Sequence, residues 1–459
     1  MTRDKRRGDA IVAWGLFGLA LSLGGGSVGF PLPRLVVELA AALCLGWYGV
    51  RGWRADAGRS TAVAMGLLIL TLLLIGLQLV PLPPAVWRQM PGRLLAAGVL
   101  DTVGASEQWM PVSLDPSATQ ATAFYFLVPL VLFVGTVHLD RNGQVMLLRI
   151  FVGFALVNGL LVILQSQGMA WLTPYMTGGT RPGTGLFANK NHCATMLVMA
   201  MPAAAAVSQE WRRTSAPAAR RMAGGVMVGF LAMTVFGCLS RAGLALLPIG
   251  LGASVFILLP RNLSRRHLLI GAGLAIAVLI VAAIILPQTH IVEQALIRFN
   301  SDQDERYNFW PDVLKGIRHY FPIGSGLGTF VPVYATEESL VTVHRTYTNH
   351  AHSDYLEIAL ETGVAGLALV GAFLVWFAVT VWHRMVAQPA KAGMPILLVA
   401  LIGIVILLCH SAVDYPLRTL ALAGSMAVFG GILASTAPFQ DAASEVMRYR
   451  RRTKGNFHR

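Results

Sequence analysis

The stretch Gly363-Val-Ala-Gly-Leu-Ala-Leu-Val-Gly-Ala-Phe-Leu-Val-Trp-Phe-Ala-Val-Thr-Val-Trp382 decides the fold, because it contains no charged residue. Its length matches the roughly 20 apolar residues that an α-helix needs to cross a bilayer core. Similar runs recur along the chain, and short Arg-rich or Pro/Gly-rich segments separate them. With 55% hydrophobic and 13% charged residues, the chain is too apolar for a soluble protein of 459 residues. The sequence therefore predicts an all-α polytopic membrane protein.

We expect about twelve transmembrane helices, each of about 20 residues. Their predicted ranges are 11–30, 34–50, 61–80, 119–137, 145–166, 189–207, 222–239, 243–260, 268–286, 363–382, 394–413 and 418–437. The first run follows a basic segment, as in a secretory signal peptide, but it is long and lacks a small-residue cleavage site. We therefore expect it to remain as the first helix.

The basic residues indicate the orientation. Most of the 36 Lys and Arg residues fall in the two termini and in alternate loops, and basic loops stay on the cytoplasmic side. This pattern places both termini in the cytoplasm. It also explains the net charge of +14 without nucleic-acid binding, because the charge is spread over several loops that face an anionic membrane surface.

The predicted spans divide the chain into four parts. Residues 1–286 hold the first nine helices with two outer loops at 81–118 and 167–192, residues 287–362 form a large outer loop, residues 363–437 hold the last three helices, and residues 438–459 form a basic cytoplasmic tail. Long loops on a compact scaffold are usually functional or disordered. The large outer loop is too rich in Trp, Tyr, Phe and Ile to be disordered.

Ionisable residues gather directly before the tenth predicted span, in Asn349-His-Ala-His-Ser-Asp-Tyr-Leu-Glu-Ile-Ala-Leu-Glu361. Ionisable groups at a membrane boundary are costly and usually functional. If the helix extends back to His352, its imidazole shares a face with Gly363 and Gly366 at the mouth of a helix bundle. A neutral imidazole is suited to general-base catalysis near neutral pH.

The neighbours of this candidate base have less certain roles. Asp354, Glu357 and Glu361 are equally placed to orient the imidazole, or to do no more than solvate the helix, and His350 is a secondary candidate. The segment His350-Ala-His-Ser-Asp354 also imitates the HxHxD core of binuclear metallohydrolases. That motif continues with a further His, whereas position 355 is Tyr, and no second His or Cys cluster supplies the remaining ligands. We therefore expect no metal.

The four cysteines, Cys44, Cys193, Cys238 and Cys409, form no CxxC pair and lie within or at the ends of apolar spans. Buried thiols that pack as small hydrophobic groups are the simplest interpretation. A disulfide between two residues at helix ends stays open as an alternative.

Arginines are the main charges expected outside the cytoplasm. Arg241 lies in the tight turn Leu239-Ser-Arg-Ala-Gly243 between two apolar runs, close to the membrane boundary. Such an arginine often only snorkels to lipid headgroups. The outer arginines as a set suit an anionic diphosphate, because a guanidinium group binds phosphate bidentately and keeps its charge. They are Arg181, Arg241, Arg298, Arg306, Arg318, Arg345 and Arg418.

These motifs resemble the O-antigen ligase and O-antigen polymerase superfamily of bacterial inner-membrane proteins. The resemblance is carried by Pro81-Leu-Pro83, Val112-Ser-Leu-Asp115, Arg181, Gly185-Leu-Phe-Ala-Asn-Lys-Asn191, Ser240-Arg241, Arg306 to Trp310, Pro322-Ile-Gly-Ser-Gly-Leu-Gly328, and His352-Ser353 followed by nine residues and Gly363. Leu367 stands where ligases tend to have Thr, which leaves the choice between ligase and polymerase open.

The resemblance implies a GT-C-like helical fold with a periplasmic active site and a metal-independent glycosyltransferase that needs no cofactor. The implied donor is a glycan on undecaprenyl diphosphate, and for a ligase the acceptor is lipid A core. By motif position, His352 matches the essential histidine of the family, and Arg241 and Arg306 match the arginines assigned to the diphosphate. Arg181 and Asn191 lie in a family motif whose role is less settled.

The chemistry expected from these residues is a one-step displacement that inverts the anomeric configuration, with histidine as base and arginines stabilising the leaving diphosphate. The partners are then the lipid-linked donor, a glycan or lipid A core acceptor and membrane lipids, without nucleic acid. The alternatives are a polymerase of O-antigen or exopolysaccharide repeat units, a protein O-oligosaccharyltransferase, and a transporter of lipid-linked glycans. A transporter is disfavoured because the spans are nearly free of central charge.

Overall fold

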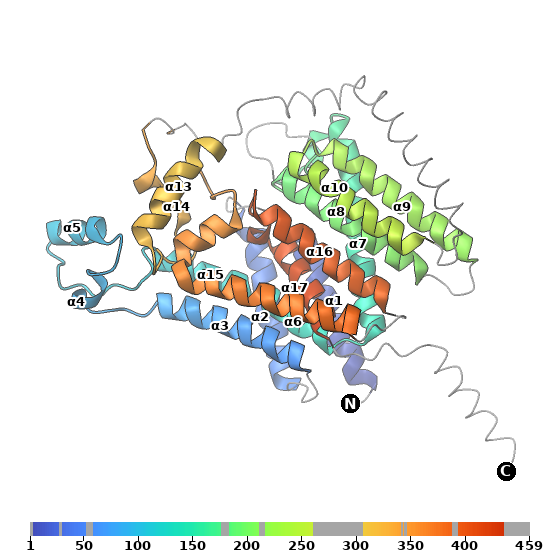
Figure 1. Ribbon diagram of the computed structural model, residues 1–459, viewed down its shortest axis with the longest axis horizontal. Helices are drawn as coiled ribbons and strands as arrows, with labels where there is room; N and C mark the ends of the chain where they lie inside the picture. Colours follow the sequence, from blue (N-terminus) through green and yellow to red (C-terminus); the bar gives the residue numbers. More distant parts are fainter. Residues whose placement is uncertain are drawn as a thin grey trace, which may run out of the picture.

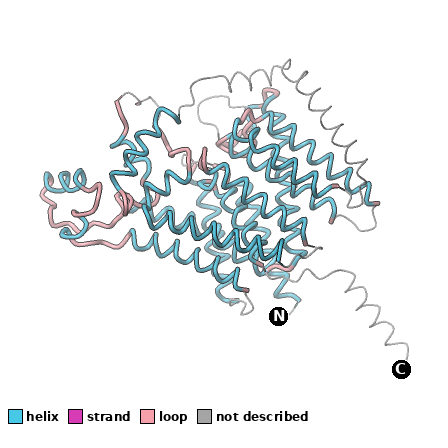
Figure 2. Tube along the Cα trace, in the orientation of Figure 1, coloured by secondary structure: helices cyan, strands magenta, loops and turns pink. Residues whose placement is uncertain are grey.

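The computed structural model describes residues 3–26, 30–51, 58–175, 183–210, 216–259, 306–340, 343, 347–387 and 393–435. Over these residues the chain is helical, and extended pairing is limited to one bridge between Leu82 and Met110 (Figures 1 and 2). Among the described residues, 8 helices are long and apolar enough to cross a membrane. They are α2 (Pro31–Arg51), α3 (Arg59–Gln78), α6 (Pro116–His138), α7 (Arg141–Ser166), α9 (Pro217–Gly237), α10 (Arg241–Leu258), α15 (Asp354–Val381) continued by η3 (Trp382–Ala387), and α16 (Met394–Ser411). The chain is thus a polytopic helical membrane protein.

Three further helices coincide with predicted spans and lie outside that set of eight: α1 (Arg3–Leu23), α8 (Lys190–Gln209) and α17 (Leu420–Ala434). The first ends seven residues before the predicted boundary at Phe30, because Gly24-Gly-Gly26 follows Leu23. The predicted ninth span, 268–286, lies outside the described residues.

The centre of the bundle is formed by α8 and α17, which are buried along almost their whole length. Helix α8 packs against α7, α9, α10 and α16, and α17 packs against α6, α1 and α16. Small residues allow this close approach, since a Cβ atom added at Gly243 would lie 2.4 Å from Ala194 and one added at Gly431 would lie 2.7 Å from Thr136. A helix that is apolar on all sides is expected in such a position.

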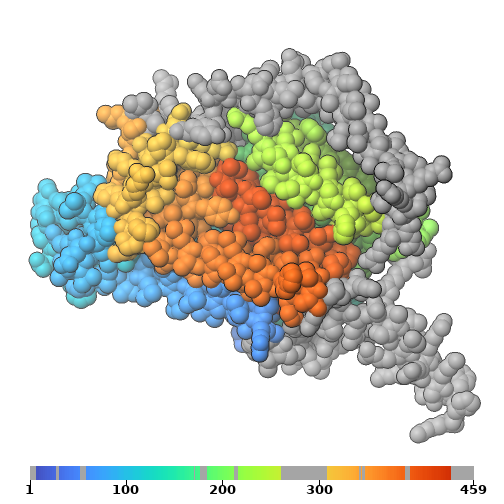
Figure 3. Space-filling view, in the orientation of Figure 1, coloured from blue at the N-terminus to red at the C-terminus, as the bar shows by residue number. Residues whose placement is uncertain are grey.

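Shorter helices cover the end of the bundle opposite to the N-terminus, here called the α13–α14 end (Figures 1 and 3). They are α4 (Pro84–Trp87), α5 (Leu94–Thr102), α13 (Arg306–Tyr320) and α14 (Phe330–Glu337), with the single turns η1 (Ala170–Leu172) and η4 (Pro416–Arg418). Helices α13 and α14 share a hydrophobic cluster that includes Val313, Tyr320, Phe330 and Tyr334. The described part of the large outer loop is therefore folded.

The glycine run Gly324–Gly328 forms a turn that fastens these helices to α15. All three of its glycines have positive φ angles, and the N–H of Gly326 donates to the carbonyl oxygen of Glu361 at 2.9 Å. Gly363 bends α15 at the same place with φ 55°. A Cβ atom at Gly363 would lie 2.0 Å from the carbonyl oxygen of Pro322, so only glycine fits there.

Candidate active site

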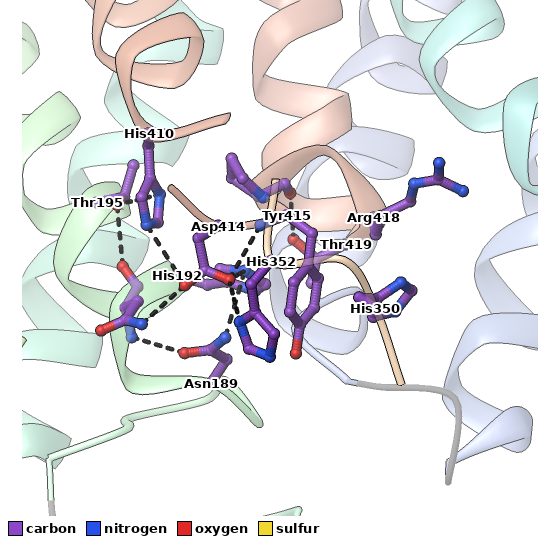
Figure 4. A network of polar contacts seen from close by, with 12 residues as sticks. Asn189, His192, Thr195, His350, His352, His410, Asp414, Tyr415, Arg418 and Thr419 are labelled. Atoms are coloured by element: carbon purple, nitrogen blue, oxygen red, sulfur yellow. Dashed lines mark hydrogen bonds and ion pairs between the residues drawn. The ribbon is translucent and has the colours of Figure 1, made fainter. Parts of the chain in front are cut away.

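Four segments from distant parts of the chain meet at the α13–α14 end of the bundle, and side chains of the first three named below are labelled in Figure 4. They are the loop 349–353 before α15, the loop 412–419 after α16, the start of α8 and the turn before α10. Most of the polar side chains that they contribute are buried, and those groups are linked by hydrogen bonds. The site is therefore a single connected network.

His352 contacts a carboxylate that is distant in sequence. Its Nδ1 atom lies 3.3 Å from Oδ1 of Asp414, and the exposed fraction is 30% for the His352 side chain and 0% for Asp414. The imidazole is thus partly accessible to a ligand, while its Nδ1 edge is held by a buried acid.

The expected helical placement of His352 was wrong. Its backbone is left-handed, with φ 48°, and Ser353 caps α15 by accepting a hydrogen bond from the N–H of Leu356, so the helix begins at Asp354. Left-handed backbone is uncommon in residues other than glycine, and it clusters at functional sites. The bend directs the imidazole toward the loop after α16, away from the face of α15.

Asp414 is the centre of the network. Its carboxylate accepts a hydrogen bond from Nδ2 of Asn191 at 2.7 Å and one from the N–H of Tyr415 at 3.0 Å. Two buried imidazoles also approach it, His410 at 3.6 Å and His192 at 3.9 Å. Figure 4 shows the three histidines arranged around this acid.

The charge state of Asp414 follows from these contacts. Burial raises its pKa, but the neighbouring imidazoles of His352 and His410 outweigh that effect and hold the pKa well below the ordinary value. Asp414 is therefore a carboxylate at neutral pH. A carboxylate facing Nδ1 of His352 selects the tautomer with the proton on Nδ1, which leaves the lone pair of the neutral ring on Nε2.

Asn191 connects this acid to the turn that carries Arg241. Its Oδ1 atom accepts a hydrogen bond from Oγ of Ser240 at 2.8 Å. Ser240 is also the N-cap of α10, because its Oγ accepts from the N–H of Gly243 at 3.0 Å. Arg241 is the next residue and the first of α10. Of the predicted site residues, Asn191 and His352 thus contact Asp414, and Arg241 directly follows the serine that Asn191 binds.

Arg306 begins α13, which lies against the loop that carries His352. The ring of Phe309, one turn after Arg306, has its centroid 5.9 Å from that of His352, and Nε1 of Trp310 donates to the carbonyl oxygen of Ala351 at 2.9 Å. The start of α13 is therefore close to the candidate base. Arg181 lies outside the described residues.

The three acids near His352 in the sequence, Asp354, Glu357 and Glu361, contact a different cation, Arg418. This guanidinium lies 2.9 Å from Glu361, 3.5 Å from Glu357 and 3.8 Å from Asp354. Burial lowers the pKa of Arg418, but the three acids outweigh this and raise it above its ordinary value. Among the described residues His352 pairs with Asp414 and not with these three acids, so the orientation of that imidazole rests on Asp414.

His350 is held apart from His352. Its Nδ1 atom lies 2.9 Å from Oε1 of Glu357, and Oε2 of the same acid accepts from the N–H of Ala351 at 3.0 Å. The His, His and Asp of the HxHxD segment therefore face three different sets of partners. Over the described residues, no group of three or more His, Cys, Asp or Glu side chains is arranged to hold a metal ion.

Sequence reasoning missed Asp414 and gave Arg418 no distinct role. A usable signal exists, since His410, Asp414 and Arg418 recur at intervals of four residues where the eleventh predicted span ends. The rule that ionisable residues at a membrane boundary are usually functional applies to the end of the eleventh predicted span as it does to the segment before the tenth.

Fold and site together define a helical membrane protein with a His–carboxylate pair and arginines at one end of its bundle. Residues 225–371 match the family model described as O-antigen ligase, a range that contains Arg241, Arg306 and His352. This match supports the O-antigen ligase superfamily and, in general, an activity of the ligase or polymerase type. No curated protein matched the chain.

Proposed function

We propose that this protein transfers a glycan from undecaprenyl diphosphate to a hydroxyl group of an acceptor at the periplasmic face of the bacterial inner membrane. As in an O-antigen ligase, the acceptor is lipid A core. The observation that carries the proposal is the contact between His352 and Asp414, which lies beside the Ser240–Arg241 turn and next to the start of α13.

His352 acts as the base. Nε2 takes the proton of the acceptor hydroxyl as its oxygen bonds to C1 of the donor sugar, and the bond from C1 to the phosphate oxygen breaks in the same step. Asp414 holds the ring and stabilises the imidazolium that forms. Attack from the face opposite to the leaving group inverts C1. A positioned base contributes about 10²–10⁴-fold in rate.

Arg241 and Arg306 stabilise the leaving diphosphate. Fixed guanidinium groups in a partly desolvated site favour the charge that develops on the leaving oxygen. Arg418 is assigned a different role, because three carboxylates already compensate its charge within 3.8 Å. It connects the loop after α16 to α15 and so keeps Asp414 in place.

An apolar cavity of about 350 Å³ suits the lipid part of the donor. It lies between α3, α6, α15 and α17 and extends from Asp354 and Leu327 to Trp376. Its walls are almost entirely hydrocarbon. The end of the cavity at Asp354 reaches the acid cluster around Arg418. An isoprenoid chain in this cavity places its diphosphate at the α13–α14 end.

A repeat-unit polymerase of O-antigen or exopolysaccharide is the second candidate, and the family match supports it equally. The base, the leaving group and the donor are the same in both reactions. Only the acceptor differs, since a polymerase adds the glycan to another lipid-linked chain. Lipid-linked glycan transport remains as a further outcome of the test below.

The test is a reconstituted reaction with a defined undecaprenyl-diphosphate glycan and lipid A core. We expect glycan on lipid A core; longer lipid-linked chains would identify a polymerase, and unchanged donor on the opposite leaflet a transporter. His352→Ala should abolish transfer. The matched control is His319→Ala, because His319 pairs with Glu337 in the same layer and does not belong to the network.

The diphosphate site is tested by Arg241→Ala together with Arg306→Ala, which should reduce transfer by several orders of magnitude. Arg318→Ala, on the last turn of α13, is the control and should transfer normally. Undiminished transfer in the double variant, or in His352→Ala, would refute the corresponding assignment.

A further inference from the structure

A second cavity lies at the N-terminal end of the bundle, far along α6 and α7 from the candidate active site. Its volume is about 350 Å³, and it is enclosed by the start of α1, the end of α6 and the start of α7. Two arginines, Arg7 and Arg149, belong to its wall. Nothing in the proposed reaction uses this cavity.

Among the described residues of the cavity wall, the arginines outnumber the acids. Among the described side chains, neither Arg7 nor Arg149 has an ion-pair partner. Asp140 is the one acid of the wall, and its carboxylate is engaged in capping α7 through the N–H of Gly143 at 2.9 Å. The adjacent Arg141 shows the contrast, because it pairs with Glu210 at 2.6 Å.

Two further features favour an anion. The cavity faces the N-terminus of α7, a helix of 26 residues whose dipole adds partial positive charge at that end. The exposed amide side chain of Asn142, on the first turn of the same helix, supplies hydrogen-bonding groups at the rim.

Much of the remaining wall of the cavity is apolar. It is formed by Ala10 and Trp14 of α1 with Leu139 and Met146 near the junction of α6 and α7. Trp14 is fixed in position, because its Nε1 donates to the carbonyl oxygen of Gly143 at 3.1 Å. A free inorganic anion makes no favourable contact with apolar side chains. A phospholipid, by contrast, presents a phosphate together with the beginning of its acyl chains.

We propose that this cavity binds the phosphate headgroup of an anionic phospholipid. Arg7 and Arg149 hold the phosphate, and the acyl chains leave along Trp14 and Met146 into the bilayer. The lipid joins α1 to the connection between α6 and α7. The distribution of Lys and Arg assigns this end to the cytoplasmic side, where basic pockets between helices bind anionic headgroups.

The experiment is lipid titration of the purified full-length chain by native mass spectrometry. Phosphatidylglycerol and phosphatidylcholine with identical acyl chains are the two lipid probes, and inorganic phosphate is the third. We expect the wild type to retain phosphatidylglycerol more tightly than phosphatidylcholine by about tenfold or more, on the basis of two arginines at a membrane surface. Inorganic phosphate in millimolar excess should not displace the lipid.

The double variant Arg7→Gln, Arg149→Gln should lose the preference for phosphatidylglycerol, and Arg7→Lys, Arg149→Lys should keep most of it. The control Arg59→Gln, Arg221→Gln removes the same charge from the starts of α3 and α9, outside the cavity, and should bind like the wild type. If the glutamine variant does not fold, the wild-type titration and the lysine variant still test whether the cavity prefers phosphatidylglycerol.

Three outcomes would overturn the proposal. Equal retention of both lipids by the wild type would show that the headgroup is not recognised. An equal loss in the Arg59, Arg221 control would show that only the overall charge matters. Displacement of the lipid by inorganic phosphate would identify a free-anion site instead.

Discussion

His352 and Asp414 meet across the α13–α14 end of the bundle, with Nδ1 of the imidazole 3.3 Å from Oδ1 of the carboxylate. The acid is completely buried and the imidazole is partly exposed. One residue precedes α15 and the other follows α16, so the pair forms only when both helices are in place. The orientation of the proposed base thus depends on the tertiary fold.

The first prediction concerns Asp414→Asn. The amide is nearly isosteric but cannot stabilise a charged imidazolium, so we expect the rate of transfer to fall by about 10²-fold or more while donor binding changes little. The measurement is kcat and KM for the donor. A variant that loses donor affinity and keeps kcat would contradict the positioning role. Glu357→Gln, which removes the partner of His350, is the comparison and should have a smaller effect on kcat.

The second prediction uses the pH dependence of stability. The pKa of Asp414 is held well below its ordinary value by the neighbouring imidazoles of His352 and His410, against the opposite effect of burial. Its ionised form therefore stabilises the fold above the ordinary Asp pKa of about 3.9, and this contribution is lost as the pH falls through the lower pKa of the folded state. The difference in Tm between the wild type and Asp414→Asn should be constant near neutral pH and shrink below about pH 4. A difference that grows on acidification would show that the acid is protonated in the folded protein.

The third prediction concerns Arg418→Ala. Removing this cation leaves the buried acids Asp354, Glu357 and Glu361 without their shared counter-ion, and breaking a buried ion pair in this way costs about 3–5 kcal/mol. The variant should unfold at lower temperature in detergent and accumulate poorly in the membrane. Arg88→Ala, which breaks the surface pair with Asp101, should change little. If Arg418→Ala keeps the wild-type Tm and loses only donor affinity, the guanidinium binds substrate instead.

The fourth prediction is that chelators leave transfer unchanged. His350 is directed to Glu357 and His352 to Asp414, with Nδ1 of each ring at 2.9 Å and 3.3 Å from its own acid. Each imidazole therefore pairs with its own carboxylate, and the two rings do not converge on one metal position. Loss of activity after treatment with EDTA, followed by recovery on addition of one divalent metal, would contradict this assignment.

The sequence predicted the helical scaffold well because a bilayer imposes a simple rule on length and polarity. Eleven predicted spans correspond to described helices, and the polar segment before the tenth span does carry the exposed histidine. The left-handed backbone at His352 was not predictable, because the contact with the loop 412–419 that accompanies it is tertiary. The pairing of acids was missed for a related reason. Asp354, Glu357 and Glu361 are close to His352 in sequence, but their helical spacing directs them all to Arg418.

The last prediction tests how the start of α8 packs against the turn between α9 and α10. Cys193 and Cys238 are buried, and their Sγ atoms lie 3.7 Å apart, two residues from Asn191 and two residues from Ser240 respectively. A disulfide needs a separation of about 2.05 Å, which side-chain rotation within this contact can approach. Treatment with a membrane-permeable oxidant should therefore link Cys193 to Cys238 slowly, and leave the half-buried Cys44 and the exposed Cys409 without an intramolecular partner.

Alkylation of the unfolded protein before and after reduction, followed by peptide mass spectrometry, measures each thiol. Cys193→Ala should leave Cys238 free to be alkylated without reduction. If Cys193 and Cys238 stay unlinked under conditions that oxidise Cys409, the two segments are further apart than the structure shows, and the route from Asn191 to Arg241 would have to be abandoned.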